Sequence, residues 1–183
     1  MYRLSLVFVL LAVSAVSAAE SVEDIINFRQ YSPGFASSGQ PTAEQLQTIA
    51  SAGFERVVYV AYSDHDNSLA NEDRLAKNLG LEYVHIPVEW DAPTASDFAL
   101  VAAALQGASN RPTLLHCQVN YRASAFSFLY RVLYEGVDMR EAKADMNSVW
   151  QPNDTWRSLI FEILQAQGRD PNCEGCNWDG PDE

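Results

Sequence analysis

The chain has 183 residues, of which 24 are Asp or Glu and 12 are Lys or Arg, and its formal net charge at pH 7 is −12. This excess of negative charge argues against nucleic acid and anionic membrane surfaces as partners. The length is enough for one domain with its own hydrophobic core.

The N-terminus has the pattern of a secretory signal peptide. Arg3 precedes an apolar run over 4–13, and small residues with an Ala-x-Ala-like end follow over 14–19. The apolar run is shorter than the ~20 residues of a membrane-spanning helix, which favours a cleaved signal over an uncleaved anchor. The sequence therefore predicts a signal peptide over 1–19, export to the periplasm or the exterior, and no stable membrane insertion after cleavage.

Helix and strand patterns alternate along the rest of the chain. Thr42 and Gln45 have the spacing of a capping box, and Gly53 marks the end of the helix that they open. The expected elements are a helix over 42–52, a strand over 56–62, a helix over 71–78, a strand over 81–88, a helix over 94–106, a strand over 113–116, and helices over 122–134, 139–149 and 154–167. This alternation predicts an α/β domain over 20–168, with a central, mostly parallel sheet flanked by helices.

The chain contains three cysteines, and an oxidising compartment favours their pairing. Cys173 and Cys176 form a C-x-x-C in the acidic segment over 169–183, which we expect to be a disordered C-terminal tail. These two cysteines are candidates for a local disulfide. Cys117 is then the odd thiol, and a leftover thiol in an exported protein is a candidate for reactivity.

Cys117 lies where a reactive cysteine is expected in an α/β fold. It follows the strand over 113–116, and a four-residue loop separates it from Arg122, which opens the next helix. Ligands of open α/β sheets bind at the carboxyl ends of the strands, and the N–H groups of a helix N-terminus attract anions and favour a thiolate. A guanidinium can bind two phosphate oxygens at once. The pattern predicts oxyanion chemistry, with a buried structural cysteine as the alternative.

His116-Cys117-x-x-x-x-Arg122 on a strand–loop–helix unit resembles the phosphate-binding loop of the protein tyrosine and dual-specificity phosphatases. The segments over 37–41, 56–62 and 83–88 also resemble compact bacterial members of that group, so the resemblance extends over about 28–167. It implies a dual-specificity-phosphatase-like fold in an exported phosphoric monoester hydrolase. The loop is shortened, because the family usually has five residues between the cysteine and the arginine.

The resemblance also implies a role for each residue of the loop. Cys117 would attack phosphorus and form a phosphocysteine, Arg122 would hold phosphate oxygens, and water would release the phosphate. Asn120 replaces the usual loop glycine and is the residue type that best tolerates positive φ after glycine. Ser124 keeps the usual distance from the cysteine and is expected to steady the leaving thiolate. The phosphate-binding residues implied are His116, Gln118, Val119, Asn120, Tyr121 and Ser124.

The family also supplies a general acid from a loop after the strand that precedes the catalytic strand. The corresponding loop here is 89–93, where Asp91 is the expected acid and Glu89 the alternative. No cofactor or metal is expected, because Arg122 and backbone N–H groups supply the positive charge. The Asp-His-Asp sequence over 64–66 is a weak metal signal, and we expect a solvated turn there.

Two other functions remain open at this stage. A rhodanese-like sulfurtransferase would carry a persulfide on Cys117, and such domains often have four residues between the cysteine and the arginine. A pseudophosphatase would bind phosphate with little or no turnover. The expected substrate is a phosphorylated protein or a small phosphate ester, and the oligomeric state is not predicted.

Overall fold

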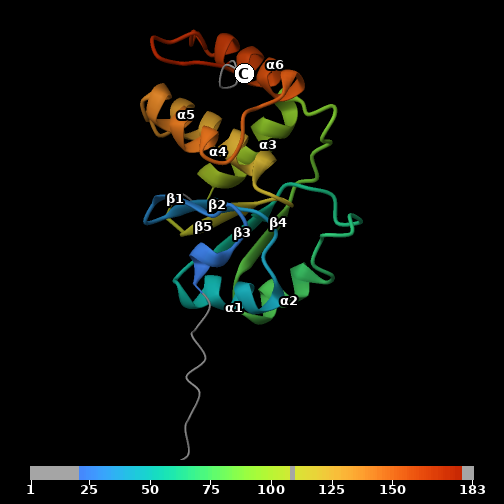
Figure 1. Cartoon of the computed structure of the whole chain (residues 1–183). Helices are drawn as coiled ribbons and strands as arrows, with labels where there is room; N and C mark the ends of the chain where they lie inside the picture. Colours follow the sequence, from blue (N-terminus) through green and yellow to red (C-terminus); the bar gives the residue numbers. More distant parts are fainter. Residues whose placement is uncertain (1–20, 108–109, 179–183) are drawn as a thin grey trace, which may run out of the picture.

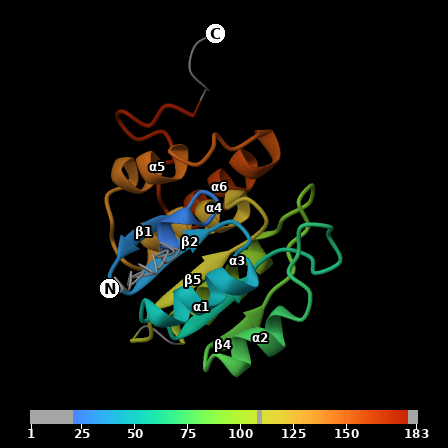
Figure 2. The same ribbon diagram turned by 60° about the horizontal axis from the view of Figure 1, so that its bottom comes forward.

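The computed structural model describes residues 21–107 and 110–178, so the expected signal peptide over 1–19 lies outside the described residues. In Figure 1 a sheet separates two groups of helices, with α1 (Ala43–Ser51) and α2 (Glu72–Asn78) below it. Figure 2 brings these two helices in front of the strands. The arrangement is the expected α/β architecture, and that prediction is confirmed.

The sheet has five strands in the order β1-β2-β5-β3-β4. They are β1 (Arg29–Ser32), β2 (Phe35–Ser38), β3 (Arg56–Tyr59), β4 (Glu82–His85) and β5 (Thr113–His116). The neighbouring pairs are parallel except for β1 and β2, which are antiparallel. In this register Ser38 of β2 and Tyr59 of β3 lie on either side of His116, so the strand that leads to Cys117 is central.

The sequence analysis did not predict β1 and β2. All four residues of β2 are buried, and three of them are Ala or Ser, so the strand has neither the alternation nor the β-branched residues that indicate a strand. Its place is decided by pairing with β5, far along the chain.

The remaining helices lie on the other face of the sheet, in the upper layer of Figure 1. They are α3 (Ala95–Gln106), α4 (Tyr121–Leu133), α5 (Met139–Asn147) and α6 (Asp154–Ala166). A short 3-10 helix, η1 (Val22–Asp24), precedes β1 and contacts α1. α4 is buried along almost its whole length, as expected for a helix enclosed by a sheet and other helices. Within the described ranges, every helix is too short or too polar to span a bilayer.

The capping signals read from the sequence are present. Thr42 and Gln45 form a reciprocal capping box at the start of α1, and Thr94 and Asp97 form one at the start of α3. Each box satisfies backbone donors that the first turn of a helix leaves without partners. These caps begin the helices next to the loops that carry the candidate site.

The expectation of a disordered tail after Gly168 is wrong for its described part. Trp178 is 7% exposed, and its ring packs edge-on against Phe128 of α4 and Phe161 of α6. Its Nε1 donates to the carbonyl oxygen of Pro171 at 2.8 Å, and a disulfide joins Cys173 to Cys176 within this turn. A buried tryptophan can remove enough apolar area from water to order a short polar segment. The acidic composition of this segment gave no indication of that burial.

Candidate active site

The Cys117 loop forms the junction between β5 and α4. β5 ends at His116, and α4 begins at Tyr121, directly after Asn120 at φ 71°. Asparagine tolerates this left-handed conformation, as the sequence analysis expected at this position. The first-turn N–H groups of α4 have no acceptors within the helix, so they are available to an anion in the loop.

A segment near the N-terminus holds the loop from outside. Asn27 Nδ2 donates to the carbonyl oxygen of Val119 at 3.0 Å, and Asn120 Nδ2 donates to the carbonyl oxygen of Asn27 at 2.6 Å. Gly39 crosses beneath the loop so closely that an added Cβ would lie 2.9 Å from the carbonyl oxygen of Gln118. The loop is therefore braced by a segment that is distant in sequence, and the sequence analysis did not anticipate these contacts.

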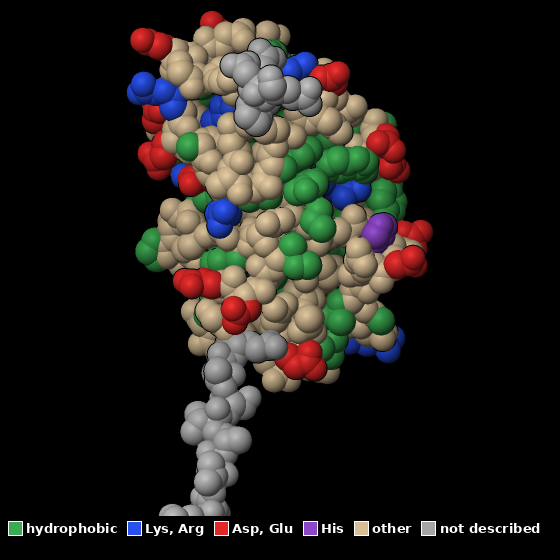
Figure 3. All heavy atoms as spheres, viewed as in Figure 1, with side chains coloured by type: hydrophobic (Ala, Val, Ile, Leu, Met, Phe, Trp, Pro, Cys, Tyr) green, Lys and Arg blue, Asp and Glu red, His purple; other side chains and the backbone are tan. Residues whose placement is uncertain are grey.

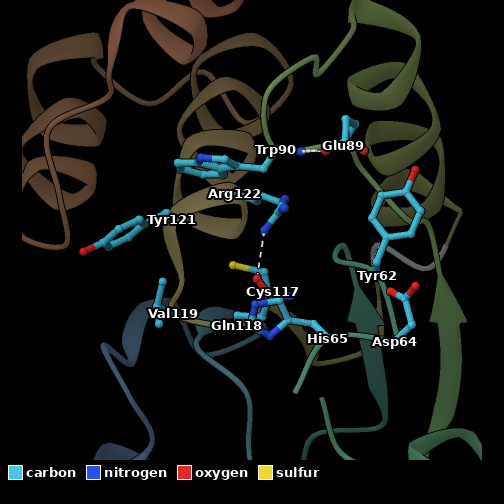
Figure 4. Close-up of a pocket in the computed structure, with 10 residues that line it drawn as sticks. All are labelled: Tyr62, Asp64, His65, Glu89, Trp90, Cys117, Gln118, Val119, Tyr121 and Arg122. Atoms are coloured by element: carbon cyan, nitrogen blue, oxygen red, sulfur yellow. Dashed lines mark hydrogen bonds between the residues drawn. The ribbon is translucent and has the colours of Figure 1, made fainter. Parts of the chain in front are cut away.

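Arg122 is oriented toward the loop by its own contacts. The side chain is buried, its Nε donates to the carbonyl oxygen of Val88 at 3.1 Å, and its Nη1 donates to Gln118 Oε1 at 3.2 Å. Its guanidinium carbon lies 5.1 Å from the ring centroid of Trp90, within cation–π range. Figure 4 shows the guanidinium directed toward Cys117. An arginine held in this way loses little further entropy when it binds an oxyanion.

Cys117 and Arg122 face a pocket of about 750 Å³. The pocket is lined by Tyr62, Asp64, His65, Glu89, Trp90, Cys117, Gln118, Val119, Tyr121 and Arg122. In Figure 4, Tyr62 and Asp64 stand on one side and Tyr121 on the other. Figure 3 shows hydrophobic side chains gathered around a basic one on this face, with acidic side chains at its margins. The pocket therefore combines a local cation with apolar walls in an acidic protein.

The structure brings together most of the loop residues expected from the sequence. Cys117, Gln118, Val119, Tyr121 and Arg122 all line the pocket. His116 and Asn120 are buried behind it. Ser124 is engaged elsewhere, because its hydroxyl donates to the carbonyl oxygen of Tyr121 at 3.1 Å and accepts from Trp150 Nε1 at 3.1 Å. Both bonds engage the Ser124 hydroxyl with partners other than its expected one, the sulfur of Cys117.

The carboxylates around the pocket differ from the expected arrangement. Glu89 and Asp64 are among the lining residues, whereas Asp91, which is also described, is not. Glu89 Oε1 accepts a hydrogen bond from the backbone N–H of Trp90 at 2.9 Å. Within the described ranges, no three His, Cys, Asp or Glu side chains are grouped so that they could hold a metal ion.

Tyr62, Asp64 and His65 contribute a wall that the sequence analysis did not assign to the site. They follow β3, which is the parallel neighbour of β5, so their loop leaves the same edge of the sheet as the Cys117 loop. That edge is where ligands of open α/β sheets bind. Strand order would have identified them, but strand order was not available from the sequence.

The fold and the loop together define the protein tyrosine and dual-specificity phosphatase superfamily. The family model described as "DSP-PTPase phosphatase fused to NAD+ Kinase" matches residues 9–178. The chain therefore belongs to the DSP-PTPase phosphatase family and has a protein tyrosine phosphatase-like, hydrolytic function. The expected superfamily and fold class are both confirmed.

Solved structures agree with this assignment. A DUF442 phosphatase from Shewanella putrefaciens CN-32 is 30% identical, with a TM-score of 0.71, over 82% of this chain and 98% of that chain. TpbA of P. aeruginosa is 21% identical with a TM-score of 0.59, over 79% of this chain and 92% of that chain. PTPMT1 is 13% identical with a TM-score of 0.64, over 77% and 98%. The last two show the shared fold alone. No curated protein sequence matches the chain.

Proposed function

We propose that the protein hydrolyses phosphoric monoesters through a phosphocysteine on Cys117. The observation that carries this proposal is the placing of the Cys117 thiol and the Arg122 guanidinium in one pocket, at the N-terminus of α4. Two positive influences converge there on the same point, the guanidinium and the helix N-terminus. Such a site favours both a thiolate and a bound phosphate.

The reaction has two steps in this proposal. The Cys117 thiolate attacks phosphorus, the S–P bond forms, and the P–O bond to the leaving group breaks while a carboxylic acid gives that oxygen a proton. Water then attacks phosphorus and gives up a proton to the same carboxylate, and the S–P bond breaks to regenerate the thiolate. Arg122 binds the nonbridging oxygens throughout, and inorganic phosphate leaves.

The acid is proposed to come from the loop between β4 and α3. Glu89 is favoured there, because it lines the pocket. Its Oε1 already accepts from Trp90 N–H, so the second carboxyl oxygen is the one that would carry the proton. Asp91, the acid expected from the sequence, lies two residues further along the same loop, and Asp64, which lines the pocket from the loop after β3, is a third candidate.

The proposed substrate is a phosphorylated protein or a small phosphate ester. A TpbA variant has been solved in complex with pTyr, and PTPMT1 in complex with PI(5)P. The rings of Tyr62, Trp90 and Tyr121 in the pocket suit a phosphate carried on an aromatic or apolar group.

The test is hydrolysis of two aryl esters, para-nitrophenyl phosphate and phenyl phosphate, under reducing conditions. Cys117→Ser should abolish turnover, and Arg122→Lys should lower kcat/KM by about 100-fold because the bidentate donor is lost. Turnover that survives Cys117→Ser would refute the proposal. Thiosulfate:cyanide sulfur transfer without ester hydrolysis would favour the sulfurtransferase, and phosphate binding without either reaction would favour the pseudophosphatase.

A second comparison identifies the acid. Glu89→Gln, Asp91→Asn and Asp64→Asn are measured with both esters, and Asp66→Asn serves as an exposed control from the Asp64 loop. Loss of the true acid should lower hydrolysis of phenyl phosphate by at least about 100-fold. The loss should be smaller for para-nitrophenyl phosphate, whose leaving oxygen needs less protonation. If Glu89→Gln leaves both esters unaffected, Glu89 is not the acid.

We also propose that the protein is exported. The signal-peptide pattern over 1–19 and the disulfide between Cys173 and Cys176 support this. Expression with the leader, followed by cell fractionation and N-terminal sequencing, should recover a chain that begins at residue 19 or 20 outside the cytoplasm. An intact N-terminus in the cytoplasm would contradict it.

A further inference from the structure

A buried carboxylate lies directly behind the Cys117 loop. Glu72, in the first turn of α2, is 4% exposed. Its Oε1 lies 3.2 Å from Nε2 of His116 and accepts a hydrogen bond from Gln40 Nε2 at 3.0 Å. A buried carboxylate is costly unless it is paired, so its presence here needs a reason.

His116 is the ionisable partner that Glu72 contacts. The ring is 0% exposed, and it stacks on Tyr59 with 4.7 Å between ring centroids. Neither ring nitrogen has an aligned hydrogen-bond partner among the described residues, and the Glu72 carboxylate is the acidic group in close contact with the ring. His116 is the last residue of β5 and immediately precedes Cys117.

Two tyrosines, a second histidine and an aspartate are the other titratable groups around Glu72 and His116. Burial raises the pKa of Tyr59 on β3, and burial also raises the pKa of Tyr83 on β4, so both phenols are neutral at neutral pH. His85 stacks on Tyr59 at 5.1 Å. Asp73 follows Glu72 on α2 but is exposed.

On the loop side, Cys117 and Arg122 are the ionisable groups that interact electrostatically with Tyr59, as Glu72 does. The ionisable groups at the base of the loop are therefore Glu72, His116, Cys117 and Arg122. Glu72 is the one carboxylate that is buried with them in the described part of the chain.

We propose that Glu72 is a positioning residue that holds His116 as a positively charged imidazolium behind the Cys117 thiolate. This rests on the proposed role of Cys117 as nucleophile. A buried imidazolium needs a counter-ion, and Glu72 is within ion-pair distance. A cation next to a cysteine raises the fraction of thiolate at a given pH. Removing the carboxylate charge leaves the buried imidazolium without a counter-ion. The ring then favours its neutral form, and the thiolate loses a neighbouring cation.

The experiment follows alkylation of Cys117 by iodoacetamide as a function of pH, quantified by mass spectrometry with the Cys173–Cys176 disulfide intact. Cys117 is then the free thiol of the described chain. Glu72→Gln keeps the side-chain size and an acceptor for Gln40. It should move the midpoint of the alkylation curve upward by about one pH unit and slow alkylation at about pH 6 by about tenfold. Asp73→Asn removes the same charge from an exposed neighbour and should leave the curve where it is.

A double-mutant cycle distinguishes action through His116 from a general effect of the charge. Glu72→Gln added to His116→Asn should slow alkylation no further, because the two residues act as one unit. The same tenfold slowing in that background overturns the proposal, and so does a wild-type curve in a folded Glu72→Gln variant. If circular dichroism shows that the Glu72→Gln variant is unfolded, Glu72→Asp is measured instead. It retracts the carboxylate by one methylene and should shift the midpoint in the same direction, and an unshifted curve overturns the proposal.

Turnover provides an independent readout. Glu72→Gln should lower kcat for para-nitrophenyl phosphate by about tenfold with little change in KM, since the loss concerns the nucleophile and not substrate binding. Alkylation does not require hydrolysis. A wild type that hydrolyses no ester but shows the shifted alkylation curve in Glu72→Gln would end the proposed function and leave this inference standing.

Discussion

Gly39→Ala should damage the Cys117 loop from a position that contributes no side chain to it. The new Cβ would lie 2.9 Å from the carbonyl oxygen of Gln118, 2.9 Å from Cβ of Ile26 and 3.0 Å from its Cγ2. Neither side yields easily, because Gly39 N–H donates to the Ile26 carbonyl and Gln40 N–H donates to the Gln118 carbonyl at 3.0 Å. Overpacking of this kind costs about 1–3 kcal/mol of unfolding free energy.

The same displacement should reach the nucleophile, since Gln118 directly follows Cys117. A misplacement of about 1 Å can cost about 100-fold in rate, so a shift of a few tenths of an ångström should lower kcat/KM by about tenfold. Urea denaturation and hydrolysis of para-nitrophenyl phosphate measure the two effects. Gly34→Ala is the matched control, because its Cβ would meet no atom within 4 Å. A Gly39→Ala protein as stable and as active as Gly34→Ala would refute the reasoning.

Three further predictions concern stability. Trp178→Ala removes the ring that anchors the C-terminal segment and should lower the free energy of unfolding by about 3 kcal/mol, measured by urea denaturation; an unchanged midpoint would show that the segment is docked only weakly. Reducing the Cys173–Cys176 disulfide should cost about 2 kcal/mol of unfolding free energy, because the unfolded chain regains the entropy that the closed loop had removed. The effect is a lower Tm in dithiothreitol, and a Cys173→Ser, Cys176→Ser double variant should not show this dependence on dithiothreitol. Thr94→Ala breaks the capping box of α3 and should cost about 1 kcal/mol, whereas the exposed Ser96→Ala should be nearly neutral; equal losses would remove the cap as the cause.

The candidate site could be predicted from the sequence where its residues are neighbours in the chain. Cys117 and Arg122 are joined by one loop, and a strand before them and a helix after them sufficed to place both at a helix N-terminus. The opposite wall was not predicted, because Asp64 and His65 approach the pocket only through the pairing of β3 with β5. Glu72 was overlooked for the same reason, since in the sequence it is one of two neighbouring acids in a short polar helix.

Local signals were sufficient for most of the elements. The capping boxes, the helix-ending glycines and the alternation of apolar runs depend on residues a few positions apart, so the sequence by itself determined an α/β domain in which the Cys117 loop joins a strand to a helix N-terminus. The tertiary structure alone decided the place of β2, the close approach of Gly39, the burial of Glu72 against His116 and the docking of Trp178. Each of these depends on contacts between segments far apart in the chain, and such contacts become favourable only once the whole core has excluded water from them.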